Sequence, residues 1–136
     1  MKKIRLKIAA AGAVAVASVV GMSGVASATQ VNSCNNQTDC FWYGAWSGSS
    51  GTGAVAAFND GAIPDLLPYY FRSAGSGSGT HVGNNSHSVK DNYSNQVMFV
   101  YYSASYQGHT EEFSVKVGGN LDSILVNNDR SVRNED

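Results

Sequence analysis

The chain has 136 residues, with nine Lys or Arg and ten Asp or Glu, so its formal charge is −1 at pH 7. This length suits one small domain, and 43% of the residues are hydrophobic, enough for a core of its own. The few basic residues are not clustered, which argues against nucleic acid and against an anionic membrane as partners.

Residues 1–28 are typical of a secretion signal, and we expect cleavage after Ala28. Four basic residues precede an apolar run over residues 8–20, and residues 26–28 are the Ala-Ser-Ala pattern that a signal peptidase recognises. A transmembrane helix is the alternative, but Ser18 and Ser23 interrupt the apolar region and no basic stop-transfer cluster follows. The secreted protein would keep five basic and ten acidic residues, a charge of −5 over 108 residues, and we expect no membrane partner.

The two cysteines, Cys34 and Cys40, are expected to form a disulfide. A secreted protein matures in an oxidising compartment, where nearby cysteines pair by default. A zinc site is the alternative, but the spacing is too long for a zinc knuckle and no second Cys or His pair completes a tetrahedral set. A loop this short adds only about 2 kcal/mol of stability in the chain-entropy model, so we interpret the pair as a clip on the N-terminal arm.

After the signal, the sequence predicts an all-β domain. No window repeats apolar residues at helical spacing over three turns, because Gly, Ser and Asn interrupt each candidate. The predicted strands are Phe41–Tyr43, Ala54–Phe58, Val97–Tyr102 and Glu112–Val117, and the predicted turns are residues 46–51, 75–79 and 118–120. Short strands with frequent turns favour a sandwich or barrel over a parallel sheet.

Two of these strands have distinct burial patterns. Val97–Tyr102 is continuously apolar and is expected to be covered on both faces. In Glu112–Val117 the polar residues alternate with Phe113, Val115 and Val117, which places those three side chains in the core.

A nine-residue element occurs twice, 43 positions apart: GNNSHSVKD at 83–91 and VNNDRSVRN at 126–134. It could be a duplicated metal loop, a duplicated active-site element or a duplicated piece of scaffold. An aromatic pattern precedes each copy: Phe41 comes before Trp46-Ser47-Gly48, and Tyr101 before Tyr106-Gln107-Gly108. We interpret the pattern as a folded hairpin, in which the first aromatic packs on the corner and the glycine supplies an unusual backbone angle.

The first copy is longer than the second. Gly48 and Asn84 are 36 positions apart, whereas Gly108 and Asn127 are 19 apart. The additional residues fall around DGAIPDLLPYYFRSAGSGSG, at 60–79. Its prolines exclude a regular helix or a central strand, so we expect a loop or a single helical turn that folds back onto the sheet, followed by a flexible Gly-Ser stretch.

The aromatic hairpin with a downstream Asn/Ser element resembles the βγ-crystallin Greek-key motif, of which two copies pack as one domain. The signal peptide, the early cysteine pair, the GAIPDL segment and the NN-x-x-S-V ending resemble the secreted bacterial proteins grouped as peptidase-inhibitor family thirty-six, which is named after a metalloproteinase inhibitor with a βγ-crystallin-like fold. The resemblance runs from Cys34 to Asn134. It implies one βγ-crystallin-like sandwich at 29–136, with motifs at about 40–91 and 96–134.

The resemblance also implies a function. We expect a secreted, monomeric inhibitor of an extracellular metalloprotease. The alternative is a secreted interaction or stress-protection module without inhibitory activity.

Calcium-binding members of the crystallin superfamily carry Asn/Asp, Asn/Asp, two variable residues, Ser/Thr and Ser in this element. In the register that preserves most of this pattern, Ser88 and Ser131 take the sixth place, so His87 and Arg130 replace the hydroxyl ligand. Calcium needs six to eight oxygen ligands, preferably with carboxylates. We therefore expect no cofactor, or at most weak calcium binding at Asn84, Asn85, Asn127 and Asn128. These amides and serines are instead expected to bond to the backbone and tie the closing strand to the hairpin.

Nothing in the sequence predicts catalysis. There is no free thiol once the cysteines pair, no Gly-x-Ser-x-Gly elbow and no His-Glu-x-x-His motif. His81 and His87 are six positions apart, a spacing that suits no common ligand set. His109 with Glu111 and Glu112 could hold a metal, but a solvated charged rim is the commoner case.

An inhibitor needs a rigid, protruding segment that loses little entropy on binding. The candidate segment has stiffening prolines and apolar side chains that could suit a thermolysin-like pocket: Ile63, Pro64, Leu66, Leu67, Pro68, Tyr69 and Tyr70. The alternative is that these residues only cover a sheet edge.

Overall fold

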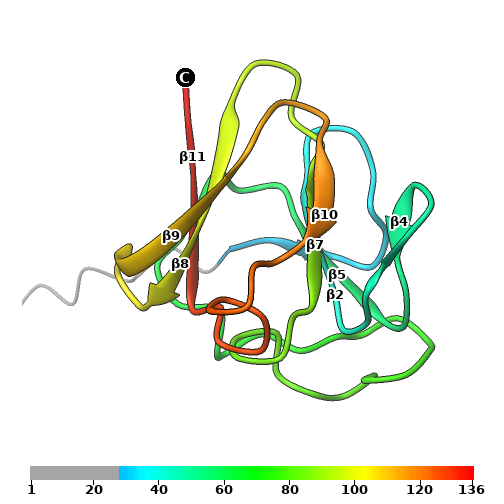
Figure 1. Cartoon of the computed structure of the whole chain (residues 1–136). Helices are drawn as coiled ribbons and strands as arrows, with labels where there is room; N and C mark the ends of the chain where they lie inside the picture. The colour runs from blue at the N-terminus through cyan, green and yellow to red at the C-terminus, as the bar shows by residue number, and fades with distance from the viewer. Residues whose placement is uncertain (1–27) are drawn as a thin grey trace, which may run out of the picture.

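The computed structural model of the chain describes residues 28–136 (Figure 1), so the predicted signal peptide lies outside the described residues except for Ala28. Across this part of the chain all regular structure is β-strand, and no helix is long and apolar enough to cross a membrane. The strands are β1 (Gln30–Val31), β2 (Asp39–Trp42), β3 (Trp46–Ser47), β4 (Ser50–Gly51), β5 (Val55–Phe58), β6 (Ala62–Ile63), β7 (Ser88–Asp91), β8 (Val97–Ser103), β9 (Gln107–Phe113), β10 (Gly118–Asn120) and β11 (Ser131–Glu135).

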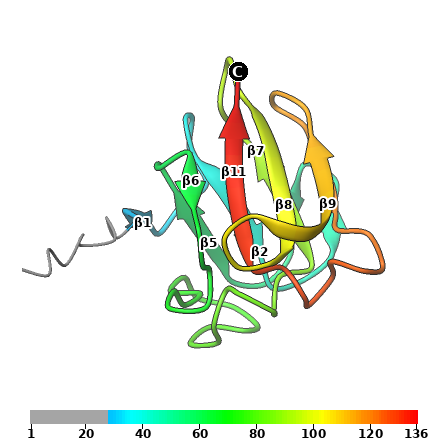
Figure 2. The same ribbon diagram turned by 90° about the vertical axis from the view of Figure 1, so that its left-hand side faces the viewer.

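The strands form two packed antiparallel sheets, with orders β1-β5-β2-β7-β10 and β6-β11-β8-β9, and the small β3-β4 hairpin. Figure 2 shows β6, β11, β8 and β9 side by side, with the other sheet behind them. In the first motif β2 and β5 pair, β6 joins the opposite sheet, and β7 returns beside β2. The second motif repeats this path with β8, β9, β10 and β11. Two interlocked Greek-key motifs result, and the predicted fold class is confirmed.

The core lies between the two sheets and is built by both motifs. Phe41 and Phe58 meet edge to face, with their ring centroids 6.0 Å apart. The loops that follow β6 and β10 add Leu66, Phe71 and Leu125, each fully buried. The 60–79 loop therefore does fold back onto the sheet, because its apolar side chains complete the core.

Strand pairing identifies which residues correspond in the two motifs. Trp42 lies opposite Ser88, and Tyr101 lies opposite Ser131, 43 positions later. The expected correspondence of Phe41 with Tyr101 is therefore wrong by one residue, since Trp42 takes that place. Trp42 contacts Trp46 edge to face with ring centroids 5.7 Å apart, as Tyr101 contacts Tyr106 at 5.8 Å. The spacing between the two aromatic residues is one residue shorter in the first hairpin than in the second. Phe41, which precedes Trp42, packs in the core.

The hairpin glycines have the expected backbone geometry. Gly48 has φ +67° and Gly108 has φ +81°, in the left-handed region where a side chain is strained.

The predicted strand Glu112–Val117 is too long. Strand β9 ends at Phe113, and Ser114–Val117 form a turn in which the Val117 N–H donates to Ser114 O over 2.9 Å. Lys116 has φ +64°, and the Val117 side chain is 49% exposed rather than buried. The chain has to turn here because β10 belongs to the opposite sheet.

Candidate functional site

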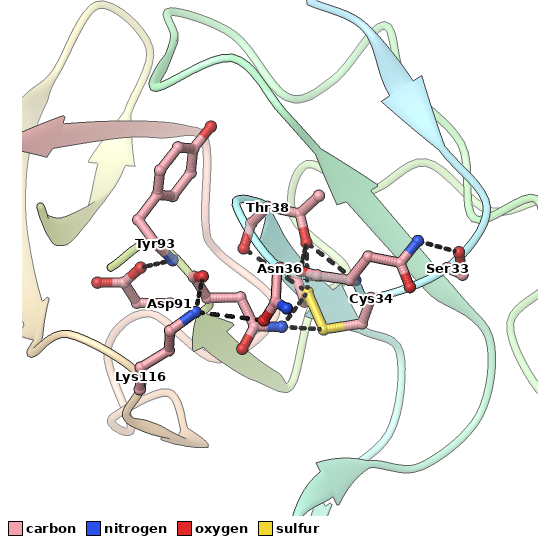
Figure 3. Close-up of a disulfide and its surroundings, with 10 residues drawn as sticks. Ser33, Cys34, Asn36, Thr38, Asp91, Tyr93 and Lys116 are labelled. Atoms are coloured by element: carbon pink, nitrogen blue, oxygen red, sulfur yellow. Dashed lines mark hydrogen bonds between the residues drawn. A yellow bond between two sulfur atoms is a disulfide. The ribbon is translucent and has the colours of Figure 1, made fainter. Parts of the chain in front are cut away.

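The predicted disulfide between Cys34 and Cys40 is present and joins the N-terminal arm to β2 (Figure 3). Cys40 is fully buried, and the Asn92 amide donates to Cys34 Sγ over 3.0 Å. The Lys116 ammonium in turn donates to the Asn92 carbonyl. The bridge therefore stabilises the start of β2 against the end of β7, which is a structural role.

The two copies of the repeated element hydrogen-bond to each other. The Asn84 N–H donates to Asp129 O over 2.7 Å, and the Asn127 N–H donates to Ser86 O over 2.9 Å. Both asparagines have positive φ, +65° and +58°. Because 84 corresponds to 127 and 86 to 129, the contact is reciprocal about the pseudo-twofold axis between the motifs.

The serines of the element tie each closing strand to its own hairpin. Ser88 Oγ donates to Gly44 O, and Ser131 Oγ donates to Ser103 O, each over 2.7 Å. Gly44 and Ser103 are equivalent, since each lies two residues after the corner aromatic. These bonds fit the scaffold interpretation of the repeat and the register in which the serines take the sixth place.

Asp129 is the carboxylate of the second copy, and it is turned inward. Its side chain is fully buried, and Oδ1 accepts the Ser86 N–H over 3.1 Å. Burial raises the pKa of the Asp129 carboxyl to about 7, although the hydrogen bonds from Ser86 lower it. This carboxylate is therefore not offered to solvent.

The candidate segment at 63–70 is split between the core and the surface. Ile63 and Leu66 are fully buried, while Pro64 and Tyr69 are half-buried, and the Tyr69 ring lies edge to face with Phe58 at 5.0 Å. The exposed members form what we call the apolar knob: Leu67, Pro68 and Tyr70, with Leu67 36% and Tyr70 41% exposed.

Hydrogen bonds hold the knob in place. The Tyr69 N–H donates to Leu66 O over 3.2 Å, which closes the turn at residues 67–68. The Leu67 N–H donates to Asp65 Oδ1 over 3.0 Å, and Leu67 O lies 2.5 Å from His81 Nδ1. The Tyr70 ring stacks on His81 with centroids 4.3 Å apart. The segment is thus braced by hydrogen bonds and packing, without a second disulfide.

A groove of about 350 Å³ opens beside the second copy of the repeated element. It is lined by residues from three parts of the chain, namely Asn84, the β8 end with its following turn (Tyr102, Ser103 and Ala104), and Asn128 with Arg130. The Arg130 guanidinium is paired with Asp65, with Nε–Oδ1 at 3.0 Å and NH2–Oδ2 at 3.2 Å.

Comparison with solved structures decides the fold. The chain is similar to a structure described as "Evolution of the eye lens beta-gamma-crystallin domain fold", with a TM-score of 0.57 and 15% identity, over 80% of this chain and 97% of that chain. The chain has a βγ-crystallin fold. No protein-family model matches its sequence, and no curated protein does. At 15% identity the similarity establishes the fold and nothing finer.

The second copy of the repeated element presents few of the oxygen ligands that calcium prefers. Arg130 places a guanidinium where a hydroxyl ligand would be needed, and Asp129 points into the interior. Asn84 and Asn128 line the groove. The backbone N–H groups of Asn84 and Asn127 donate hydrogen bonds from one copy of the element to the other. Asn85 Nδ2 donates to Gly83 O over 3.2 Å, a local bond that stabilises the loop.

His109 of the βγ-crystallin domain pairs with a carboxylate from a different loop. His109 Nε2 lies 2.5 Å from Asp122 Oδ2, and Glu111 accepts the Asp122 N–H over 2.8 Å. Glu112 lies on the other face of β9 from Glu111, so the alternative in which His109, Glu111 and Glu112 together hold a metal is not supported. Among residues 28–136, no group of three or more His, Cys, Asp or Glu side chains is placed to hold a metal. The sequence did not reveal Asp122, because it lies in a different loop.

A buried acidic pair was also missed. Asp39 and Asp91 are cross-strand partners in β2 and β7, and both are fully buried. Asp39 Oδ1 accepts the Asn134 amide over 3.2 Å, and Asp91 Oδ1 accepts the Tyr93 N–H over 2.8 Å. Burial raises the pKa of Asp39 to about 8, although the Asn134 hydrogen bond lowers it. Only the strand register, which the sequence did not show, could have found this pair.

Proposed function

We propose that this βγ-crystallin domain is a secreted, peptidase-inhibitor-like protein that acts by binding an extracellular protease through its apolar knob. One observation carries the proposal: Leu67, Pro68 and Tyr70 are exposed on a turn whose neighbours Ile63 and Leu66 are anchored in the core. A segment held in this way loses little conformational entropy on binding. The resemblance to secreted metalloproteinase inhibitors supports a protease as the target, and the disulfide is compatible with an extracellular location.

The knob would bind mainly through its side chains. The backbone groups of the turn are already used, because Leu66 O accepts from Tyr69 and the Leu67 N–H donates to Asp65. A substrate-like inhibitor leaves such groups free to pair with the protease as an added strand. We therefore propose that Leu67 fills an apolar pocket at the cleft.

An inhibition assay against a thermolysin-type metalloprotease tests this proposal. The wild-type protein should inhibit, and Leu67→Asp should weaken inhibition at least about tenfold, because a buried charge without a partner opposes binding. Ile124→Asp is the matched control, since Ile124 is 48% exposed and lies outside the knob. An absence of inhibition, or equal inhibition by Leu67→Asp and the wild type, would reject the proposed function.

The alternative is a secreted interaction or stress-protection module that inhibits nothing. The internally bonded backbone of the turn favours it, because that backbone cannot pair with a protease strand. A protein of this second kind would lack inhibition yet reduce the light scattering of an unrelated enzyme during heating. Inhibition of the protease would count against this alternative.

A further inference from the structure

The groove beside the second copy of the repeated element suggests a second binding site, lined by other residues than the apolar knob and joined to it through Asp65. We propose that this groove binds a neutral saccharide. Its volume of about 350 Å³ lies within the range of small-molecule sites, roughly 300–1,000 Å³, and at the lower end. A site of that size suits a short oligosaccharide better than a folded macromolecule.

The charges around the groove argue for a neutral ligand. The one basic side chain that lines it, Arg130, makes two hydrogen bonds to Asp65 and is neutralised by that carboxylate. A phosphate or carboxylate ligand would meet a guanidinium whose charge Asp65 already neutralises, and it would lie near that carboxylate. A cation would meet the Arg130 charge, and the nearest carboxylate of the element, Asp129, is fully buried. Neither a cation nor an anion is favoured.

The polar groups of the groove suit hydroxyls. The Asn84 side chain makes no hydrogen bond to any described residue, so both its donor and its acceptor are available. Asn128 uses its amide nitrogen on the carbonyls of Ile124 and Val126, which leaves its side-chain oxygen free to accept. Amides can donate to and accept from sugar hydroxyls, and the free Arg130 N–H groups can add donors.

Tyr102 supplies an aromatic surface next to these amides. Its side chain is 45% exposed, and within the described part of the chain its hydroxyl has no hydrogen-bond partner and its ring contacts no other aromatic. The C–H face of a sugar ring is apolar and can pack on such a surface, while the sugar hydroxyls reach the amides. Amides and an open aromatic ring together are therefore suited to a saccharide.

The equivalent tyrosine in the first motif packs on a neighbouring loop, although 36% of it stays exposed. Tyr43 follows Trp42 as Tyr102 follows Tyr101, so the two tyrosines correspond. Tyr43 packs edge to face on Phe71 at 6.0 Å and against Gly77 of the longer loop. The second motif lacks this loop, and its tyrosine stays open beside the groove.

NMR titration of the labelled protein with triacetylchitotriose, and separately with maltotriose, tests this inference. At least one of the two should shift the backbone amides of Asn84, Tyr102, Ser103 and Asn128, with a Kd of about millimolar strength. Tyr102→Ala should weaken that binding by about tenfold, whereas Tyr70→Ala should leave it unchanged. Asn84→Gly, which preserves the positive φ of +65°, should also weaken it.

Three results would overturn the inference. The first is that neither saccharide shifts these amides. The second is that Tyr70→Ala weakens binding as much as Tyr102→Ala. The third is that calcium chloride or sodium phosphate shifts the amides and the saccharides do not. The test does not depend on protease inhibition, because Tyr70 belongs to the knob and Tyr102 to the groove.

Discussion

Ser86 and Asp129 occupy the same position in the two copies of the repeated element, and they are hydrogen-bonded to each other across the pseudo-twofold axis. The duplicated sequence therefore builds the junction between the two motifs. The junction differs on its two sides, because Ser86 contributes its backbone N–H and Asp129 contributes a buried carboxyl. Stability should depend on the protonation of that carboxyl.

The pH dependence of stability follows from the raised pKa of Asp129. The pKa of about 7 means that the folded domain holds this proton up to about pH 7, whereas the unfolded chain loses it near the ordinary pKa of 3.8. Between these values the folded state binds more protons, so the free energy of unfolding should fall as pH rises from about 4 to about 7. Burial raises the pKa of Asp39 to about 8, so this carboxyl also lowers the free energy of unfolding as pH rises.

Asp129→Asn should remove part of this dependence. The Asn oxygen can still accept the Ser86 N–H, and no charge is buried at high pH. Urea unfolding should show that the stability of the variant relative to the wild type is greater at pH 8 than at pH 4. Glu112→Gln, at an exposed position of β9, is the control and should leave the pH slope unchanged. An equal slope in Asp129→Asn and the wild type would contradict this account.

The serines of the repeat should differ in their importance for stability. Ser131 Oγ donates to Ser103 O and accepts the Tyr106 N–H over 3.0 Å, and Ser88 Oγ donates to Gly44 O. Ser131→Ala would leave two backbone groups unsatisfied and should lower the free energy of unfolding by about 2–3 kcal/mol, against about 1 kcal/mol for Ser88→Ala.

The control for the serine variants is Ser123→Ala, since Ser123 is exposed in the loop after β10. It should be within about 0.5 kcal/mol of the wild type in the same urea titration. If Ser88→Ala proved the more destabilising of the two, the bond to Tyr106 would have no energetic role.

Local patterns predicted the fold because they encode backbone geometry. Gly48 and Gly108 mark positive φ angles, and Asn84 and Asn127 do the same at the start of each repeat. Such requirements depend on few neighbours, so a single sequence can reveal them. The position of Phe41 was misjudged, because an aromatic pattern cannot show that one hairpin is shorter by a residue.

The sites were harder to predict because they combine distant segments. Asp39 and Asp91 become neighbours only through the pairing of β2 with β7, and the groove joins Asn84 to residues of β8 and of the second repeat. The division of the 63–70 segment into buried and exposed residues also depends on the core that receives Leu66. An apolar run predicts that some of its side chains are buried, but it does not show which ones.

That division predicts opposite effects for two adjacent leucines. Leu66→Ala removes a fully buried side chain and should lower the free energy of unfolding by about 2–5 kcal/mol, whereas Leu67→Ala removes a side chain that is 36% exposed and should change it by less than about 1 kcal/mol. Thermal and urea unfolding measure both. Protease inhibition should show the reverse order at temperatures where both variants are folded, with Leu67→Ala the weaker inhibitor. If both variants were equally destabilised, Leu67 would belong to the core, and the knob could not be a contact surface.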